Sequence, residues 1–290
     1  MPSGLVTDST ANLPPNRAAA LGIEVVPMTI VLGGASYLEG VDVSAGLIAE
    51  QLRQGHVVTT AHPGPESFLT AYRALASRGA DSIVSMHVSS RLSGACNAAR
   101  LAAGSSPVPV RVIDSDSVAM GLGFPVLAAA ALASAGADLD DVIAEAVRVA
   151  GGVRVWFGVD DLDHLRRGGR IGGASALLGT VLSIKPLLTI SGGEVVAFDR
   201  VRTSARAIAR LAEVAVERAA AAPSQLAVHH TDAADRAEAL AEVLESVLTG
   251  VRVPVSELTA TVAVHSGPGT VAVVVAPAAA EPEASRADDA

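Results

Sequence analysis

Residues 83–103, with the sequence IVSMHVSSRLSGACNAARLAA, contain the pattern that decides the fold. The apolar, β-branched run at 83–88 predicts a strand, the serines and glycine at 89–94 predict a turn, and the stretch through Ala103 predicts a helix. A second β-branched run at 110–113 predicts the next strand. A strand, a crossover helix and another strand in this order indicate parallel pairing, because parallel neighbours need a long connection.

The same alternation extends over the first half of the chain and predicts an N-terminal α/β domain with a parallel sheet at 1–153. Asn12 is predicted to cap a helix whose first turn contains Pro14 and Pro15, where a missing backbone N–H does no harm. Asp138 is predicted to cap a later helix. The other expected strands lie at 5–7 and 24–32, and the other expected helices lie at 44–53, 66–78 and beyond 117.

The second half has more strand-like runs and predicts a smaller C-terminal α+β domain with a mixed sheet at 154–276. Ser191-Gly192-Gly193 predicts a hairpin turn between strands at 186–190 and 194–198. Residues 277–290 show no periodicity and predict a disordered tail. The other expected strands are at 153–159, 225–229, 251–255, 261–265 and 270–276, and the expected helices are at 201–222 and 233–248.

The composition excludes several classes of protein. Half of the 290 residues are hydrophobic and 18% are charged, which excludes a disordered chain. With 21 basic against 30 acidic residues, the net charge of −9 argues against nucleic acid as a partner. The single cysteine, Cys96, excludes an internal disulfide and a multi-cysteine metal site, and it favours a cytoplasmic location.

The uncharged stretch from Val118 to Ala137 is about as long as a membrane span. Gly121, Gly123 and Pro125 interrupt it, and most of its apolar content is alanine. We therefore expect a buried helix packed against the sheet, and the N-terminus shows no export signal.

Ser93 and Gly94 are the strongest candidates for binding an anion. They lie where a predicted helix begins, so a hydroxyl and a backbone amide can face a ligand together. The similar turns at 7–10 and 114–117 are explained equally well by turn formation and helix capping.

His265 precedes the turn Gly267-Pro268-Gly269, which we expect to present the imidazole at the end of a strand. Gly267, Gly269 and Ala272 have the spacing of a dinucleotide-binding loop. That interpretation is rejected, because a strand and not a helix is expected after the turn.

Two groups of arginines have two interpretations each. Arg166, Arg167 and Arg170 flank Gly168-Gly169, where they could hold a carboxylate or phosphate, or could stabilise a helix C-terminus. The second group recurs every four residues on an expected helix, which indicates a solvated face or a docking face for an acidic partner; it consists of Arg202, Arg206 and Arg210.

No metal site is predicted. The segment 160–164 is explained better as the acidic first turn of a helix, and His229 and His230 would face opposite ways on a strand. The sequence contains neither a P-loop nor a G-x-S-x-G elbow, so no complete catalytic apparatus is expected.

Taken together and in order, several segments resemble the DegV family of bacterial fatty acid-binding proteins, whose members act as the lipid-carrying subunit of fatty acid kinase. The resemblance covers nearly the whole chain. Its motifs are Thr7-Asp8-Ser9-Thr10, Val26-Pro27, Thr60 with Pro63 and Phe68, Ser90-x-Leu92-Ser93-Gly94, Ile113-Asp114-Ser115, Leu165-x-x-Gly168-Gly169-Arg170-Ile171, Ile184-Lys185-Pro186 and His265-x-Gly267-Pro268-Gly269.

The resemblance implies two domains with one long-chain fatty acid in a buried tunnel between them. The carboxylate would meet Thr60, Ser93 and the amide of Gly94, with His265 and Arg170 near the carboxylate or the kinase-facing rim. It further implies a non-enzymatic carrier that presents the carboxylate to a separate kinase for acyl-phosphate formation. Such a carrier would need no cofactor and would contact membranes at most transiently.

The sequence departs from the family pattern in two places. Ala61-His62 replaces the usual Ser-Gln after Thr60, and Ala95-Cys96 stands where Thr-Tyr is common. The first change affects the polar network around Thr60, and the second affects the packing of the pocket or its mouth.

Two other functions stay open from the sequence alone. One is an acyl or phosphate ester hydrolase with Ser93 as nucleophile and His265 as base, although no third residue is evident to orient the histidine. The other is a regulatory module in which the bound lipid serves only as a signal.

Overall fold

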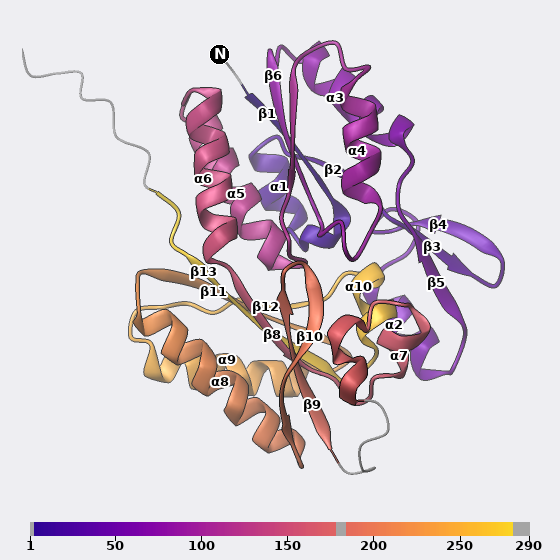
Figure 1. Cartoon of the computed structure of the whole chain (residues 1–290), viewed down its shortest axis with the longest axis vertical. Coiled ribbons are helices and arrows are strands. Elements are labelled where there is room, and N and C mark those ends of the chain that lie inside the picture. The colour runs from indigo at the N-terminus through magenta and orange to yellow at the C-terminus, as the bar shows by residue number, and fades with distance from the viewer. Residues whose placement is uncertain (1–2, 178–183, 281–290) are drawn as a thin grey trace, which may run out of the picture.

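The computed structural model describes residues 3–177 and 184–280, and its N-terminal half is built on a parallel sheet. The strand order is β2-β1-β6-β7, and every pairing is parallel, as predicted. Helices cover both faces (Figure 1), which explains why all six residues of β6 are buried. The strands are β1 (Ser3–Asp8), β2 (Glu24–Val26), β6 (Ser82–His87) and β7 (Val110–Asp114).

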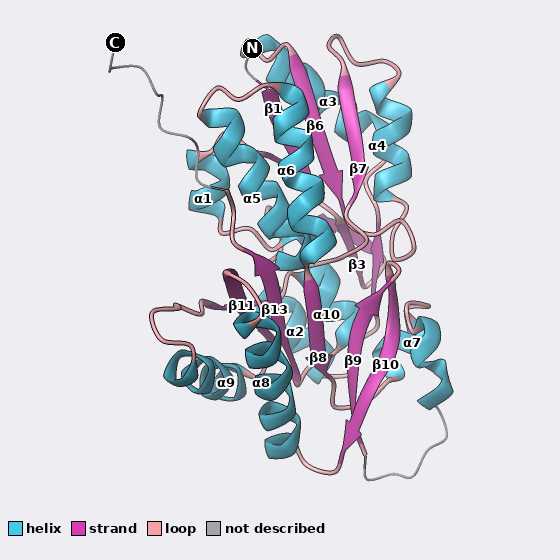
Figure 2. Ribbon diagram, turned by 60° about the vertical axis from the view of Figure 1, so that its left-hand side comes forward, coloured by secondary structure: helices cyan, strands magenta, loops and turns pink. Residues whose placement is uncertain are grey.

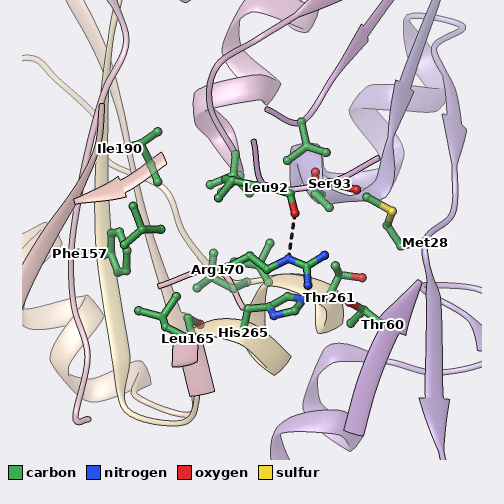
Figure 3. A pocket seen from close by; sticks show the side chains of 18 of the residues that line it. Met28, Thr60, Leu92, Ser93, Phe157, Leu165, Arg170, Ile190, Thr261 and His265 are labelled. Atoms are coloured by element: carbon green, nitrogen blue, oxygen red, sulfur yellow. Dashed lines mark hydrogen bonds between the residues drawn. The ribbon is translucent and has the colours of Figure 1, made fainter. Parts of the chain in front are cut away.

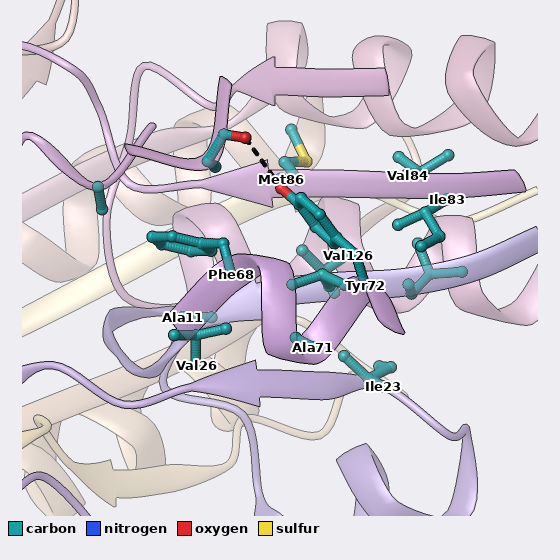
Figure 4. Close-up of a cluster of buried hydrophobic side chains, with 14 of the residues drawn as sticks. Ala11, Ile23, Val26, Phe68, Ala71, Tyr72, Ile83, Val84, Met86 and Val126 are labelled. Atoms are coloured by element: carbon teal, nitrogen blue, oxygen red, sulfur yellow. Dashed lines mark hydrogen bonds between the residues drawn. The ribbon is translucent and has the colours of Figure 1, made fainter. Parts of the chain in front are cut away.

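The helices of this half lie in two layers. On one face α3 (Pro65–Ser77) packs beside α4 (Ala95–Ala103), and on the other α5 (Met120–Ser134) packs beside α6 (Leu139–Gly152). Between the sheet and α3 lies a core that includes Phe68 and Tyr72 (Figure 4). The short α1 (Pro15–Ala20) follows the single turn η1 (Ser9–Ala11).

The C-terminal half contains a mixed sheet in the order β10-β9-β8-β13-β11-β12. Among the described strands of this sheet, only β11 and β12 pair in parallel, and the other pairings are antiparallel. The predicted hairpin joins β9 to β10, and α8 (Ser204–Ala220) and α9 (Ala234–Val247) cover one face of the sheet (Figure 2). The strands are β8 (Arg154–Gly158), β9 (Lys185–Ser191), β10 (Glu194–Val201), β11 (Ser224–Thr231), β12 (Val255–Glu257) and β13 (Thr270–Pro277).

Helix α5 joins the two halves. Its residues Met120, Phe124 and Ala128 pack against Val155 and Phe157 of β8, on the face of the mixed sheet opposite α8 and α9. The predicted boundary between residues 153 and 154 falls where α6 gives way to β8, and the division into two domains stays a prediction.

A third sheet of three strands was not predicted from the sequence. It consists of β3 (Thr29–Leu32), β4 (Ala35–Leu38) and β5 (Val58–Ala61), in the order β4-β3-β5. With α2 (Ala45–Arg53) it forms a small core on α10 (Ala260–Ser266), which belongs to the other half of the chain. This contact brings β5 next to the end of α10.

The prediction of a strand at 261–265 is wrong, because these residues form α10. The run Thr261-Val262-Ala263-Val264 has the composition of a strand. In the structure, Ala260 and Val264 lie one helical turn apart and pack against the hydrophobic side of α2 and β5, so tertiary packing overrides the local preference.

Two smaller expectations also need correction. Asn12 does not cap α1, whose N-cap is Pro14; it adopts a left-handed conformation and ends η1. Its side chain instead donates to the carbonyl of Glu257 and accepts from the amide of Thr259, which ties the halves together. The strand expected at 251–255 begins only at Val255.

Most of the uncharged stretch from Val118 to Ala137, whose length matches a membrane span, forms the buried helix α5. Across the described residues, no helix combines the length and apolar character needed to cross a membrane. Toward the C-terminus, β13 ends at Pro277. The backbone amide of Ala278 still donates to the carbonyl of Pro223, and that of Ala280 donates to the carboxylate of Glu145. The rest of the predicted tail, 281–290, lies outside the described residues.

A buried polar network supports the edge of the parallel sheet that faces the C-terminal half. Tyr72 Oη lies 2.9 Å from Ser85 Oγ, which lies 2.7 Å from His87 Nε2, and His87 Nδ1 lies 3.1 Å from an Asp8 oxygen. Asp8 also accepts from Thr10. Ser85, His87 and Asp8 follow the order of a hydrolase triad, but all three are fully buried and no substrate reaches them.

We predict that Asp8→Ala destabilises the fold by about 3 kcal/mol or more, because it leaves buried donors of His87, Val88 and Thr10 without an acceptor. Chemical denaturation measures the free energy of unfolding. The control Asp140→Ala, on the exposed face of α6, should stay within about 0.5 kcal/mol of the wild type. Equal stabilities of the two variants would contradict the role given to Asp8.

Candidate functional site

A cavity lies where the parallel sheet, the mixed sheet and α10 meet. Most of its wall is aliphatic or aromatic (Figure 3). The apolar lining residues are Met28, Ala61, Val88, Leu92, Val118, Ala119, Val155, Phe157, Leu165, Ile190, Val195, Leu258, Val262 and Ala272.

Polar side chains gather at one end of the cavity. Figure 3 shows Ile190 and Phe157 on one side, with Thr60 and the guanidinium of Arg170 toward the other. Thr60, Ser93, Arg170 and His265, all predicted from the sequence, line this single cavity, and Gly94 follows Ser93 directly. They come from β5, the turn after β6, the loop after α7 (Asp163–Arg167) and the last turn of α10.

Arg170 is a cation without a counterion at this end. Its Nε donates to the carbonyl of Leu92 at 2.9 Å, and one terminal nitrogen donates to the carbonyl of Gly168. Within the described part of the chain, the other terminal nitrogen has no partner and no carboxylate pairs with the guanidinium. Buried Glu39 accepts from Ser9 and from the amide of Thr261 instead. The guanidinium is thus fixed by two carbonyls and its charge is uncompensated.

His265 is held beside Arg170 as a neutral imidazole. Its Nε2 lies 2.8 Å from Thr60 Oγ1, and its Nδ1 is buried without a partner among residues 3–177 and 184–280. Burial, with smaller effects from the charges of Arg170 and His164, lowers the pKa of His265 to about 4. At neutral pH this histidine therefore adds no positive charge to the site.

Because Gly168 has no side chain, the His265 ring can pack directly against the end of α7 and the loop that follows it. A methyl group on Gly168 would lie 2.2 Å from His265 Nδ1, inside van der Waals contact. The backbone of Gly168 has φ −74°, which any residue adopts, so close approach and not conformation requires glycine here.

Ser93 and Gly94 present donors at the start of α4. Ser93 Oγ accepts from the amide of Ala95 at 3.3 Å, which leaves the hydroxyl proton free to donate. The Gly94 amide donates to no group in the described chain. Gly94 itself does not line the cavity, and the exposed His62 ring lies against it, with Nε2 2.6 Å from where a Cβ would stand.

Several basic residues singled out in the sequence lie outside the cavity. Arg166 pairs with Asp163 on the outer surface of α7, and Lys185 pairs with Asp160 at 2.9 Å. From the stripe on α8, Arg210 pairs with Asp199 and Glu213. Of the three arginines around Gly168-Gly169, only Arg170 reaches the cavity.

Sequence reasoning missed two hydroxyl residues of α10 that line the cavity, Thr261 and Ser266. Ser266 Oγ is buried and has no partner among the described residues. Thr261 was read as part of a strand and Ser266 as part of the turn after it, so neither hydroxyl was assigned to a site. A helix brings both hydroxyls to the side that faces the cavity.

The structure does not assemble the hydrolase pair. His265 Nε2 contacts Thr60, and Ser93 Oγ contacts the amide of Ala95. In the described chain no hydrogen bond joins Ser93 to His265, so the contact between nucleophile and base that such an enzyme uses is not formed.

Comparison with known proteins identifies close relatives. The family described as "Uncharacterised protein, DegV family" matches residues 3–278. A DegV domain-containing protein of Streptomyces coelicolor is 48% identical over 272 residues, which covers 93% of this chain and 97% of that protein.

Two solved structures have the same fold. A DegV family protein from Thermus thermophilus, described by its fatty acid binding, aligns with a TM-score of 0.89 and 36% identity over 96% of this chain and 100% of that one. DegV from Bacillus subtilis, described as a fatty acid-binding protein, aligns with a TM-score of 0.89 and 30% identity over the same shares.

We predict that Gly168→Ala displaces the His265 ring and lowers the free energy of unfolding by about 1–3 kcal/mol, because the added methyl overlaps the imidazole. The pKa of His265, about 4 in the wild type, should rise toward its ordinary value as water reaches the ring. NMR titration and chemical denaturation measure the two effects. Gly151→Ala, in open space on α6, is the control and should be neutral or slightly stabilising. An unchanged His265 pKa in Gly168→Ala would refute the packing argument.

Proposed function

The chain belongs to the DegV family, and we propose that it binds one long-chain fatty acid in the cavity between its two halves. The acyl chain would occupy the apolar part, and the carboxylate would lie at the end formed by Thr60, Ser93, Arg170 and His265. The uncompensated guanidinium of Arg170 at the polar end of an apolar cavity carries this proposal.

A carboxylate needs such an end because an ionised group cannot be buried without partners. The free terminal nitrogen of Arg170 supplies a charge-assisted donor, and the hydroxyl of Ser93 supplies a neutral one. Together they match the oxygen lone pairs of one carboxylate better than a phosphate dianion, whose additional charge would need a second cation.

Neutral His265 supports Thr60 as a further donor. With the proton on Nε2, His265 donates to Thr60 Oγ1, and the hydroxyl proton of Thr60 is free to point at the ligand. The same tautomer leaves Nδ1 as a bare acceptor, so no buried N–H lacks a partner. His265 is thus a positioning residue for Thr60.

The acyl chain supplies most of the binding free energy in this proposal. At about 0.8 kcal/mol for each buried CH₂, a long chain contributes on the order of 10 kcal/mol as an upper estimate. The aliphatic wall gives that burial without polar contacts, so the carboxylate end sets the orientation of the ligand.

We further propose that the protein is a carrier, which presents the carboxylate to a separate ATP-dependent kinase and retains the acyl phosphate. Resemblance to the DegV family supports this role, as does the separation of Ser93 from His265, which leaves the serine as a ligand and not a nucleophile. Release to a membrane and a cytoplasmic location belong to the same proposal.

Calorimetric titration with palmitate tests the lipid site. Arg170→Met should lower the affinity at least tenfold, because it removes the charge-assisted donor and leaves the carboxylate underpaired. Ser93→Ala should weaken binding less, by about threefold to tenfold. The control Arg166→Met, on the outer face of α7, should bind palmitate as the wild type does.

Two results would overturn the proposal. One is wild-type protein, stripped of lipid and shown to be folded, that binds no palmitate. The other is a palmitate affinity of folded Arg170→Met equal to that of the wild type, which would remove the guanidinium from the site.

A further inference from the structure

The edge of the parallel sheet formed by β7 is open to a further strand. Among the described strands β7 pairs with β6 alone, whereas β6 is paired on both sides (Figure 2). All five residues of β7, Val110–Asp114, line a groove between α4 and α6, which we call the β7 groove. Arg100 and Ala103 of α4 form one wall, and Ile143 and Val147 of α6 form the other. Within the described chain, helices flank this edge but no strand covers it.

The outer backbone groups of β7 have no partner in the described chain. The amide of Ile83 in β6 donates to the carbonyl of Pro109, so Pro109 turns its backbone groups toward β6. Successive residues of a strand point these groups to opposite sides, so Val110 and Val112 turn their N–H and C=O groups into the β7 groove. Free N–H and C=O groups at alternate positions are what an added strand binds.

The other edges of the two main sheets are blocked, which sets β7 apart. The edge strands β2 and β12 have only three residues each, and a proline stands next to each of them, Pro27 after β2 and Pro254 before β12. The edge strand β10 has an irregular register between Ala197 and Asp199. Short strands, prolines and bulges are common ways to keep an edge from pairing. Over its described length, β7 contains no proline and keeps an unbroken register with β6.

Two arginines give the β7 groove a positive charge. Arg100 donates to the side chain of Asn97 at 2.8 Å, Arg111 is exposed, and neither forms an ion pair with another described residue. Asp114, at the carboxyl end of β7, is the one acid among the described residues that line the groove, and it already accepts from the amide of Asp116 at 3.0 Å. The charge of the groove therefore favours a segment with acidic side chains.

The two faces of β7 offer different side chains to such a segment. Ser85 of β6 contacts Tyr72 of α3 and is in register with Val112, so Val112 faces the side covered by α3 and α4. Arg111 then faces the opposite side, toward α6, where the side of Val147 that is 53% exposed leaves apolar surface to be covered. A bound strand places its alternate residues against these two faces.

We propose that the β7 groove binds an extended peptide segment of another protein, which adds a strand to the parallel sheet and places an acidic side chain opposite Arg111. Main-chain hydrogen bonds to Val110 and Val112 supply affinity, and the alternation of side chains supplies selectivity. A second copy of this chain fits less well, because its own helices beside β7 would meet the walls of the groove. The proposal is independent of the lipid site, since no described residue lines both the groove and the cavity.

NMR titration of the full chain with the probe peptide acetyl-Thr-Val-Glu-Val-Thr-Val-amide tests the main-chain bonds. The wild type should bind the probe with a dissociation constant of about 1 mM or tighter, and the amide signals of Val110 and Val112 should shift. Val112→Pro removes one outward N–H at an edge position where proline is tolerated, and it should weaken binding about tenfold or more. The control Val112→Thr keeps the N–H and should bind as the wild type does.

A charge exchange tests the role of Arg111. Arg111→Glu should weaken binding of the probe about tenfold, and a probe with lysine in place of its glutamate should recover most of that loss. Arg206→Glu changes the net charge equally on the exposed surface of α8 and should leave both affinities unchanged. Equal affinities of wild type and Arg111→Glu for the acidic probe would remove Arg111 from the site.

A probe methylated on its backbone nitrogens keeps the test decisive if Val112→Pro does not fold. It cannot donate to the carbonyls of β7 and should not bind the wild type. Equal binding of the methylated and unmodified probes would overturn the proposal, as would a folded wild type that binds no probe. Self-association of the wild type in sedimentation, lost in Arg111→Glu, would instead assign the edge to a second copy of the chain.

Discussion

The candidate site is organised around one uncompensated charge, the guanidinium of Arg170, which lies at the end of an apolar cavity. Two carbonyl groups fix it: Leu92 in the N-terminal half and Gly168 in its own loop. The bond to Leu92 joins the two halves at the place where their side chains enclose the cavity. Arg170 is partly buried, and a cation beside an apolar cavity is stabilised when an anion pairs with it, so the polar end suits a carboxylate.

Four segments pack around Arg170 and complete the site: α5, β5, α10 and the loop after α7. Helix α5 packs on both main sheets and sets the distance between them. The small sheet with β5 packs on α10, which brings Thr60 within hydrogen-bond distance of His265. Gly168 permits the close approach of the imidazole to the loop after α7. Because these contacts exclude water, His265 stays neutral and acts through Thr60.

Much of this arrangement was predictable from local sequence, and the remainder was set by contacts distant in the chain. The parallel sheet, the hairpin at Ser191-Gly192-Gly193 and the turn at Ser93-Gly94 were predicted, because their periodicity and turn residues are local signals. Residues 261–265 were wrongly expected to form a strand, since β-branched composition was overridden by packing on α2. The unpaired state of Arg170, in contrast to paired Arg166, depends on tertiary geometry that spacing does not contain.

The most direct measurement of the central claim is mass spectrometry of the purified protein, first under native and then under denaturing conditions. The account predicts a native mass that exceeds the chain by one long-chain fatty acid, and release of that acid on denaturation. A native mass equal to that of the chain alone, unchanged after incubation with palmitate, would contradict it.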